Sequence, residues 1–167
     1  MIFKFLSKNF YISFSIVFLI YFLDRLSKIY VIQYDKNNLG SDIFNSTYLN
    51  IILIWNKGIA FGLLSFNESY LYNIITLTIA IIIIVLIVMS LKSQGFKRYS
   101  LLMIIGGALG NLHDRIFFNA VPDFIDFHIG NFHWFIFNVA DIFITAGVIS
   151  MIIFEILSNN KKQNESF

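Results

Sequence analysis

Two stretches near the C-terminus combine acids with apolar residues: VPDFIDF, at Val121–Phe127, and FNVADIFITAG, at Phe137–Gly147. In the second stretch, Asp141 stands inside a run that otherwise has the composition of a membrane helix. A carboxylate at membrane depth is unfavourable unless it is paired, solvated or protonated, so such a residue is a candidate for function. The question is what Asp141 does and which residues accompany it.

Two acids and one water are enough to hydrolyse an amide bond. Two carboxyl groups about 3 Å apart cannot both ionise, so one keeps its proton. The ionised group can take a proton from water that attacks a carbonyl, and the protonated group can later protonate the leaving amine. This aspartic-protease chemistry needs a second acid beside Asp141, and Asp123, 18 residues earlier, is a reasonable candidate. Spacing alone leaves three others open: Asp24, Asp114 and Asp126.

The composition places these acids in a membrane protein. Of 167 residues, 57% are hydrophobic and 13% charged, which is too apolar for a soluble domain of this size. The absence of cysteine excludes thiolate catalysis and Cys-ligated metals. The net charge of +2 is too small to indicate nucleic-acid binding, and the three histidines form no His-x-x-x-His pair. We therefore expect no metal and no cofactor.

Apolar windows predict an all-α membrane protein with a single domain, residues 1–167, and four transmembrane helices. The helices are expected at about 10–32, 72–91, 100–118 and 134–157. Residues 1–23 could pass for a secretory signal, but no small-x-small cleavage site follows, so we interpret them as part of an uncleaved first helix. Basic residues flank the helices at three places, which the positive-inside rule assigns to the cytoplasm together with both termini: Lys4 and Lys8; Lys92, Lys97 and Arg98; Lys161 and Lys162.

The loop between the first two helices is too long to be a simple connector. It contains STYLNIILIWN, whose β-branched and aromatic content predicts strands. We expect a small β element within 35–71, on the outer membrane surface. The polar tail, 158–167, is expected to be disordered.

Helical rise places three charged residues at a similar depth. Asp24, Arg115 and Asp141 lie about 21 to 24 Å from the cytoplasmic ends of their helices, near the outer surface. A shared layer favours a shared site. Asp24 could instead belong to a cluster with Arg25 and Lys28 whose side chains snorkel to the interface. Asp114, next to Arg115, is interpreted as one half of a structural ion pair.

The remaining polar residues have simpler interpretations. Asp141 could be a carboxylate hydrogen-bonded between helices, without any chemistry. Asp126, His128 and His133 are expected in a wet loop and are assigned no chemistry. The stretch GGALGN carries small residues that allow membrane helices to approach closely, and Asn111 at its end can hydrogen-bond across the bundle.

Five motifs, in order over most of the chain, resemble the lipoprotein signal peptidase (signal peptidase II) family. They are LDRLSK at Leu23–Lys28, NKGIAFG at Asn56–Gly62, GGALGNLHDR at Gly106–Arg115, VPDFIDF at Val121–Phe127 and FNVAD at Phe137–Asp141. The resemblance implies four helices with an extracytoplasmic β-cradle and a short outer helix. It also implies a multi-pass enzyme of the bacterial inner membrane whose active site lies near the outer leaflet.

The same resemblance implies an aspartic endopeptidase that removes the signal peptide of a prolipoprotein just before its diacylglyceryl-modified cysteine. Asp123 and Asp141 match the catalytic pair. Supporting and substrate-contacting positions match Asp24, Asn56, Gly58, Asn111, Asp114, Arg115, Asn138 and Ala140. The expected partners are the lipidated substrate, membrane phospholipid and inhibitors of the globomycin type. A monomer suffices for this chemistry.

The chain departs from the family pattern at three positions. Arg25 replaces a glutamine, which adds a charge that needs a partner. Pro122 disfavours helical geometry at Val121. Ile142 stands where a small or hydroxyl side chain is common, which predicts the loss of one hydrogen bond near Asp141.

Two other functions are compatible with acids in a membrane. A small transporter or proton-coupled channel would place its acids in steps across the bilayer. A non-catalytic scaffold would pair its acids with Arg25 and Arg115 and would tolerate Asp→Asn changes.

Overall fold

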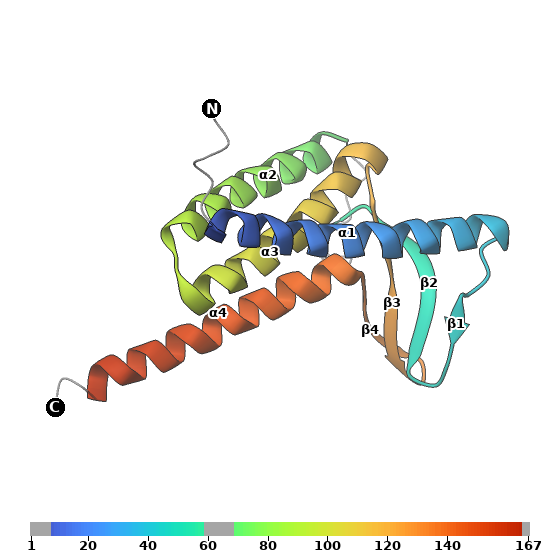
Figure 1. The fold of residues 1–167 in the computed structure, drawn as a ribbon. Helices are drawn as coiled ribbons and strands as arrows, with labels where there is room; N and C mark the ends of the chain where they lie inside the picture. The colour runs from blue at the N-terminus through green and yellow to red at the C-terminus, as the bar shows by residue number, and fades with distance from the viewer. Residues whose placement is uncertain (1–7, 59–68, 165–167) are drawn as a thin grey trace.

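The computed structural model describes residues 8–58 and 69–164. Its four long helices are α1 (Lys8–Asn37), α2 (Ser69–Lys92), α3 (Gly95–Phe118) and α4 (Val139–Asn164). α3 lies at the centre and contacts each of the other three (Figure 1). α1 begins and α4 ends at the end of the bundle farthest from the β-sheet (Figure 1).

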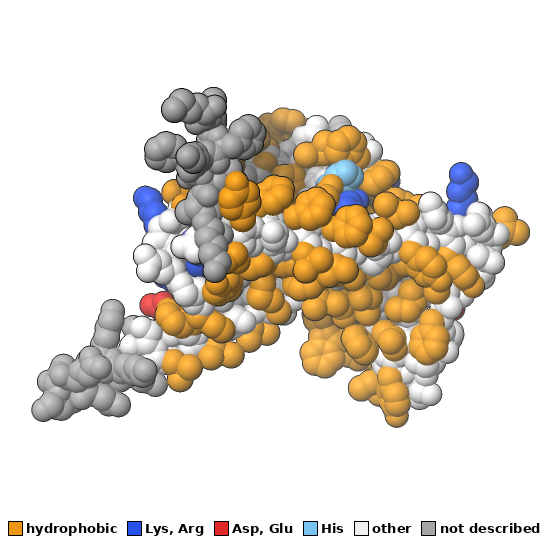
Figure 2. All heavy atoms as spheres, viewed as in Figure 1, with side chains coloured by type: hydrophobic (Ala, Val, Ile, Leu, Met, Phe, Trp, Pro, Cys, Tyr) orange, Lys and Arg blue, Asp and Glu red, His pale blue; other side chains and the backbone are white. Residues whose placement is uncertain are grey.

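Among the described residues, three segments are long and apolar enough to cross a membrane: Tyr70–Lys92, Gly95–Phe118 and Val139–Ser158. α1 is longer, with 30 residues, but the charges of its LDRLSK motif make it less apolar than these three. Its surface is nevertheless rich in exposed aromatic rings, including Phe14, Phe18 and Phe22, which stack in succession along one side. Apolar side chains dominate the face shown in Figure 2. Such a surface suits contact with lipid.

A four-stranded antiparallel sheet lies at the end of the bundle where α4 begins (Figure 1). In order across the sheet its strands are β1 (Phe44–Asn45), β2 (Leu49–Asn56), β3 (Val121–Ile129) and β4 (Phe132–Phe137). β2 and β3 contact α1, and β3 also contacts α3. The sheet therefore joins the first long loop to the connection between α3 and α4.

Two of the four strands, β3 and β4, come from the connection between α3 and α4, which was expected to be a wet loop. The fourth helix was expected to start at about residue 134, and this prediction was wrong. Residue 134 lies in β4, and α4 begins only at Val139. Gly130, with a φ of 58°, forms the turn between β3 and β4. Apolar composition does not distinguish a buried strand from a helix, so the aromatic residues of β4 from position 134 onward were wrongly assigned to the fourth helix.

The C-terminal tail also differs from the prediction of disorder, because α4 continues to Asn164. No proline or glycine interrupts residues 158–164, so the helical hydrogen-bond ladder can continue beyond the apolar segment. The expected short outer helix is absent from the described part of the first loop, 38–58, which holds strands instead. The rest of that loop, 59–68, lies outside the described residues.

Candidate active site

Glycines on α3 bring three helices together beneath the sheet. A Cβ added at Gly107 would collide with the backbone oxygen of Ala140 on α4 and would lie 2.9 Å from Ile144. A Cβ added at Gly110 would collide with the carboxylate of Asp24 on α1. Small residues are needed at both positions, and the close packing predicted for this stretch is confirmed.

Asp123 lies on β3, and two carboxamides hold its carboxylate. The Nδ2 of Asn56 donates to Oδ2 at 2.8 Å, and the Nδ2 of Asn138 donates to Oδ1 at 2.6 Å. Asn56 is placed there because it ends β2 and pairs with Val121, the residue that starts β3. Asp123 is only 3% exposed. Burial, followed by the negative charge of Asp141, raises the pKa of Asp123 to about 6.

Asp141 is held by the start of its own helix. Asn138 precedes α4, and its Oδ1 accepts a hydrogen bond from the backbone N–H of Asp141 at 3.1 Å. In return, Oδ2 of Asp141 accepts from the backbone N–H of Asn138 at 3.2 Å. This is a capping box, with aspartate in the third helical position. The Nδ2 of Asn111 on α3 donates to the other oxygen, Oδ1, at 2.8 Å.

The two acids line one small cavity of about 200 Å³, together with Asn56, Asn111 and Arg115. Asp141 is 8% exposed. None of the ion pairs among the described residues includes Asp123 or Asp141. The cavity thus holds two buried carboxylates. Both accept hydrogen bonds from amides, and neither forms an ion pair among the described residues.

A network of ion pairs lies next to these two acids. Asp24 and Asp114 are fully buried and are bridged by Lys28, whose Nζ lies 2.9 Å from Asp24 and 2.7 Å from Asp114. Arg25 contacts the same two acids, at 3.0 and 2.6 Å. The partner of Arg25 is therefore found, and two positive charges balance two negative ones.

The structure overturns two interpretations of these charges. Lys28 has a side-chain exposure of 0% and Arg25 of 11%, so neither snorkels to the interface. Arg115 does not pair with Asp114, whose two carboxylate oxygens contact Arg25 and Lys28 instead. It donates instead to the backbone oxygens of Asn111 and Gly58, each at 3.2 Å.

The ion network is connected to the acid pair through two hydrogen bonds. Lys28 donates to Oδ1 of Asn111 at 2.8 Å, which directs the Nδ2 of Asn111 toward Asp141. Asp24 accepts a hydrogen bond from the backbone N–H of Ala140 at 3.0 Å, in the first turn of α4. Lys28 was absent from the predicted site residues, although its i,i+4 spacing from Asp24 indicates a pair on one helix face.

All ten residues predicted for the site lie in this region. They are Asp123 and Asp141, with Asp24, Asn56, Gly58, Asn111, Asp114, Arg115, Asn138 and Ala140. Asp126 is not among them and lies farther along β3. The acids form one connected cluster, rather than the series of steps across the bilayer that an ion path would need.

Asp126, His128 and His133 were expected in a wet loop, and this prediction was wrong. Asp126 and His128 are on β3 and His133 is on β4, and Asp126 is fully buried. Val121 and Pro122 are also in β3, so the restriction that proline imposes is satisfied by extended backbone.

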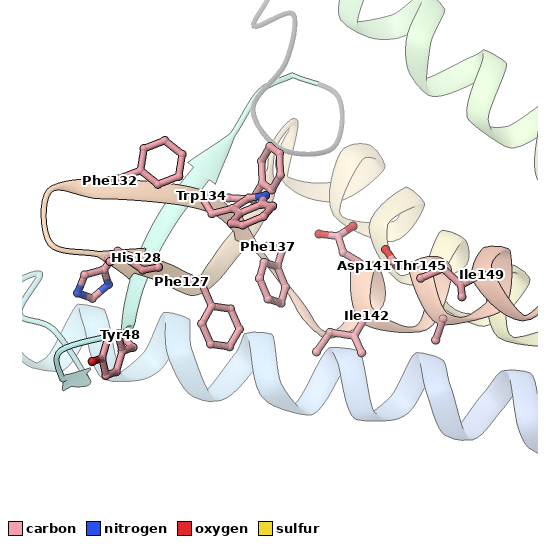
Figure 3. A pocket seen from close by; sticks show the side chains of 13 residues that line it. Tyr48, Phe127, His128, Phe132, Trp134, Phe137, Asp141, Ile142, Thr145 and Ile149 are labelled. Atoms are coloured by element: carbon pink, nitrogen blue, oxygen red, sulfur yellow. The ribbon is translucent and has the colours of Figure 1, made fainter.

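A large apolar pocket opens beside the acid pair. Its volume is about 840 Å³, and it lies between the β3–β4 hairpin and α4 (Figure 3). Phe127 and Phe137 line it from the hairpin, and Ile142 and Ile149 line it from α4, while Asp141 stands at its inner edge (Figure 3). Ile142 thus contributes to an apolar wall. The pocket suits a hydrophobic ligand whose reacting group reaches Asp141.

Comparisons with known proteins agree with this arrangement. Residues 16–157 match the family model described as signal peptidase (SPase) II. The chain is 51% identical to the lipoprotein signal peptidase of Pelagibacter ubique (strain HTCC1062), over 95% of each chain. It is 44% identical to that of Anaplasma phagocytophilum (strain HZ), over 80% of this chain and 85% of the other.

Solved structures of bacterial membrane enzymes share the fold. One, determined by the in meso method at 2.3 Å, has a TM-score of 0.71 and 31% sequence identity, with 90% of each chain covered. Another, at 1.9 Å, has a TM-score of 0.64 and 32% identity, over 84% of this chain and 90% of the other. The chain is therefore a bacterial membrane protein, and it belongs to the signal peptidase II family of lipoprotein-processing proteases.

Proposed function

We propose that this protein is an aspartic endopeptidase in which Asp123 and Asp141 activate water. The observation that carries the proposal is the shared cavity, where two buried carboxylates receive only amide hydrogen bonds among the described residues. In this proposal the two acids, which line the same cavity, hold one proton between them. The ionised carboxylate takes a proton from the attacking water, and the protonated one donates to the carbonyl oxygen and then to the leaving amine.

The substrate in this proposal is a prolipoprotein that already carries a diacylglyceryl group on its cysteine, and the bond cut lies just before that cysteine. The apolar pocket beside Asp141 suits the hydrophobic part of such a substrate, because aromatic and aliphatic side chains line most of it. Membrane phospholipid competes for the same surface, and an inhibitor of the globomycin type would occupy the acid pair. A single chain supplies every group that the chemistry uses.

We further propose that α1 also spans the bilayer, which gives four transmembrane helices in the bacterial inner membrane. Its exposed phenylalanines support contact with lipid, and its buried charges are neutralised internally. With four spans, both termini are cytoplasmic, as the distribution of lysine and arginine favours. The sheet and the acid pair then lie at the outer leaflet, where a lipidated cysteine is anchored.

The test is cleavage of a diacylglyceryl-modified prolipoprotein in vitro, followed as a gel shift. We expect Asp141→Asn and Asp123→Asn each to lower the cleavage rate by about 10²–10⁴-fold, the usual contribution of a general acid or base. Asp42→Asn, the same change at an exposed acid of the first loop, is the matched control and should leave the rate unchanged.

Thermal unfolding of each variant shows whether it is folded. A folded Asp141→Asn protein that cuts at the wild-type rate would rule out the acid pair and restore the scaffold hypothesis. Wild-type protein that is folded but does not cut this substrate would contradict the proposed substrate.

A further inference from the structure

A second cluster of ionisable side chains lies on the β3–β4 hairpin, away from the acid pair. His128 on β3 is paired directly with His133 on β4, and their rings stack with centroids 5.2 Å apart. Asp126 lies beside them: its Oδ2 is 2.8 Å from Nδ1 of His133 and 3.9 Å from Nδ1 of His128. The search for a His-x-x-x-His pair on one helix could not find this cluster, because its members lie on two strands.

Two features of the cluster are unusual for a purely structural contact. The Asp126 carboxylate is fully buried, yet its ion-pair partners among the described residues are histidines, with no lysine or arginine. The side chain of His128 is 10% exposed, and its Nδ1 is buried without a hydrogen-bond partner in the described part of the chain. A buried ring nitrogen normally has a partner, because leaving it unpaired is unfavourable. This nitrogen faces the carboxylate across a gap too long for a hydrogen bond.

A divalent metal ion would satisfy all three groups. One donor atom from each residue lies within 4.8 Å of the other two. In a tetrahedral zinc site the metal–ligand bonds are about 2.0–2.1 Å, which separates the donors by about 3.3 Å. The separations of 2.8 and 3.9 Å from Asp126 lie on either side of that value, so shifts of about half an ångström would suffice for these two pairs.

We propose that Asp126, His128 and His133 bind Zn²⁺ on the hairpin. Two imidazoles and one carboxylate suit zinc, whereas calcium and magnesium prefer sites made of oxygen ligands. His133 has a side-chain exposure of 51%, which leaves a path for the ion and room for a water as fourth ligand. None of the contacts described for these three residues involves Asp123 or Asp141, so the metal would take no part in the proposed acid–base chemistry.

The consequence of metal binding would be mechanical. Zinc would join β3 to β4 close to their turn, and His128 also lines the large apolar pocket (Figure 3). The ion would therefore fix one wall of that pocket. Without metal the two strands are held there by backbone pairing and by the Asp126–His133 contact.

The experiment uses the 167-residue chain without a histidine tag, purified in detergent and stripped with a chelator. Zn²⁺ binding is measured by competition with a chromophoric chelator, and Co²⁺ is added separately because its visible absorption reports on tetrahedral coordination. We expect one Zn²⁺ per chain and a rise in melting temperature on adding it, since a ligand that binds only the folded state stabilises that state. His128→Gln and His133→Gln should each weaken binding at least tenfold and abolish the shift in melting temperature.

His113→Gln is the matched control. His113 is the remaining histidine of the three in the chain. It lies on α3, where its Nδ1 contacts the hydroxyl of Tyr21, so this variant should bind zinc like the wild type. If the wild type binds no Zn²⁺, or if His128→Gln and His133→Gln bind it as tightly as His113→Gln does, the cluster is only a hydrogen-bonded Asp–His contact and the proposal is wrong. His133→Gln keeps the test decisive even if changes at the buried residues prevent folding.

Discussion

Two pairs of buried aspartates lie within one hydrogen-bond network, and their surroundings are opposite. Asp24 and Asp114 share two cations, Arg25 and Lys28, so that group of four is electrically neutral. The catalytic candidates, Asp123 and Asp141, share only amides among the contacts described for them. The residue type is the same in both pairs. The difference is whether a cation forms a direct ion pair with the carboxylate among the described residues.

That difference separates a structural acid from a reactive one. A carboxylate that is paired with a cation is held in place by that partner, so it can fix the positions of the helices that carry the two groups. A buried carboxylate that receives only amide hydrogen bonds beside a second acid keeps a pKa near the working range, as the value of about 6 for Asp123 illustrates. Lys28 and Asn111 link the two pairs, so the neutral network positions the proposed catalytic pair.

The largest effect on stability is expected from removing one cation from the neutral group of four that contains Asp24 and Asp114. Lys28→Met would leave Asp24 and Asp114 with Arg25 alone, and loss of one partner from a buried ion pair costs about 3–5 kcal/mol. We expect the melting temperature in detergent to fall sharply or the protein not to accumulate in membranes. Lys36→Met changes an exposed lysine of the same helix and should behave as wild type.

A double variant sharpens this prediction. Lys28→Met combined with Asp114→Asn removes one charge of each sign, so it should recover part of the stability that Lys28→Met loses. No recovery would mean that Lys28 acts through packing or through Asn111 rather than through charge. Asp141→Asn, in contrast, should keep a melting temperature close to that of the wild type.

A smaller effect is expected from separating α3 and α4 at the level of the acids. Gly107→Ala would push α3 away from Ala140, and such overpacking typically costs about 1–3 kcal/mol. Gly147→Ala separates the same two helices near Ser100 and Ile104, far from the acids. Both variants should melt earlier. We expect only Gly107→Ala to lower the cleavage rate per folded molecule, and equal losses in both would show that the spacing at the site has no special role.

The smallest effect is a shift in pH dependence. The pair needs one proton, so the apparent second-order rate constant of cleavage should fall as pH rises through about 6, the pKa of Asp123. The hydrogen bond from Asn56 favours the ionised form and lowers this pKa, so Asn56→Ala should move the fall to higher pH. A pH–rate profile of wild type and variant measures this. A shift to lower pH in Asn56→Ala would contradict the protonation scheme.

Only part of the site could be predicted from local rules. An acid in an apolar helix is rare enough to indicate function, which marked Asp141. Asn56, Gly58, Asn138 and Ala140 were predicted from the family resemblance alone. The pairing of Asp123 with Asp141, however, came from the family resemblance, because spacing alone left other acids open. The structure supplies the shared cavity that makes this pairing physically reasonable.

Other features depended on contacts between distant segments and could not be read locally. β3 and β4 are strands because they pair with β2 and with each other, whereas their composition alone also suits a membrane helix. Arg25 and Lys28 share a second partner, Asp114, which lies on α3 and is 86 positions from Lys28. The histidines were assigned to a loop for the same reason, since only strand pairing brings His128 and His133 together.

The hydrogen bond from Ala140 to Asp24 joins residues 116 positions apart, and this has a consequence for biosynthesis. At a translation rate of about 5–20 residues per second, roughly 6–23 s separate the synthesis of these two residues. During that interval α1 has no fourth helix to bind, and Asp123 lacks the carboxamide of Asn138. A nascent chain therefore lacks part of the proposed site until α4 has been made, so we expect no cleavage activity before that point.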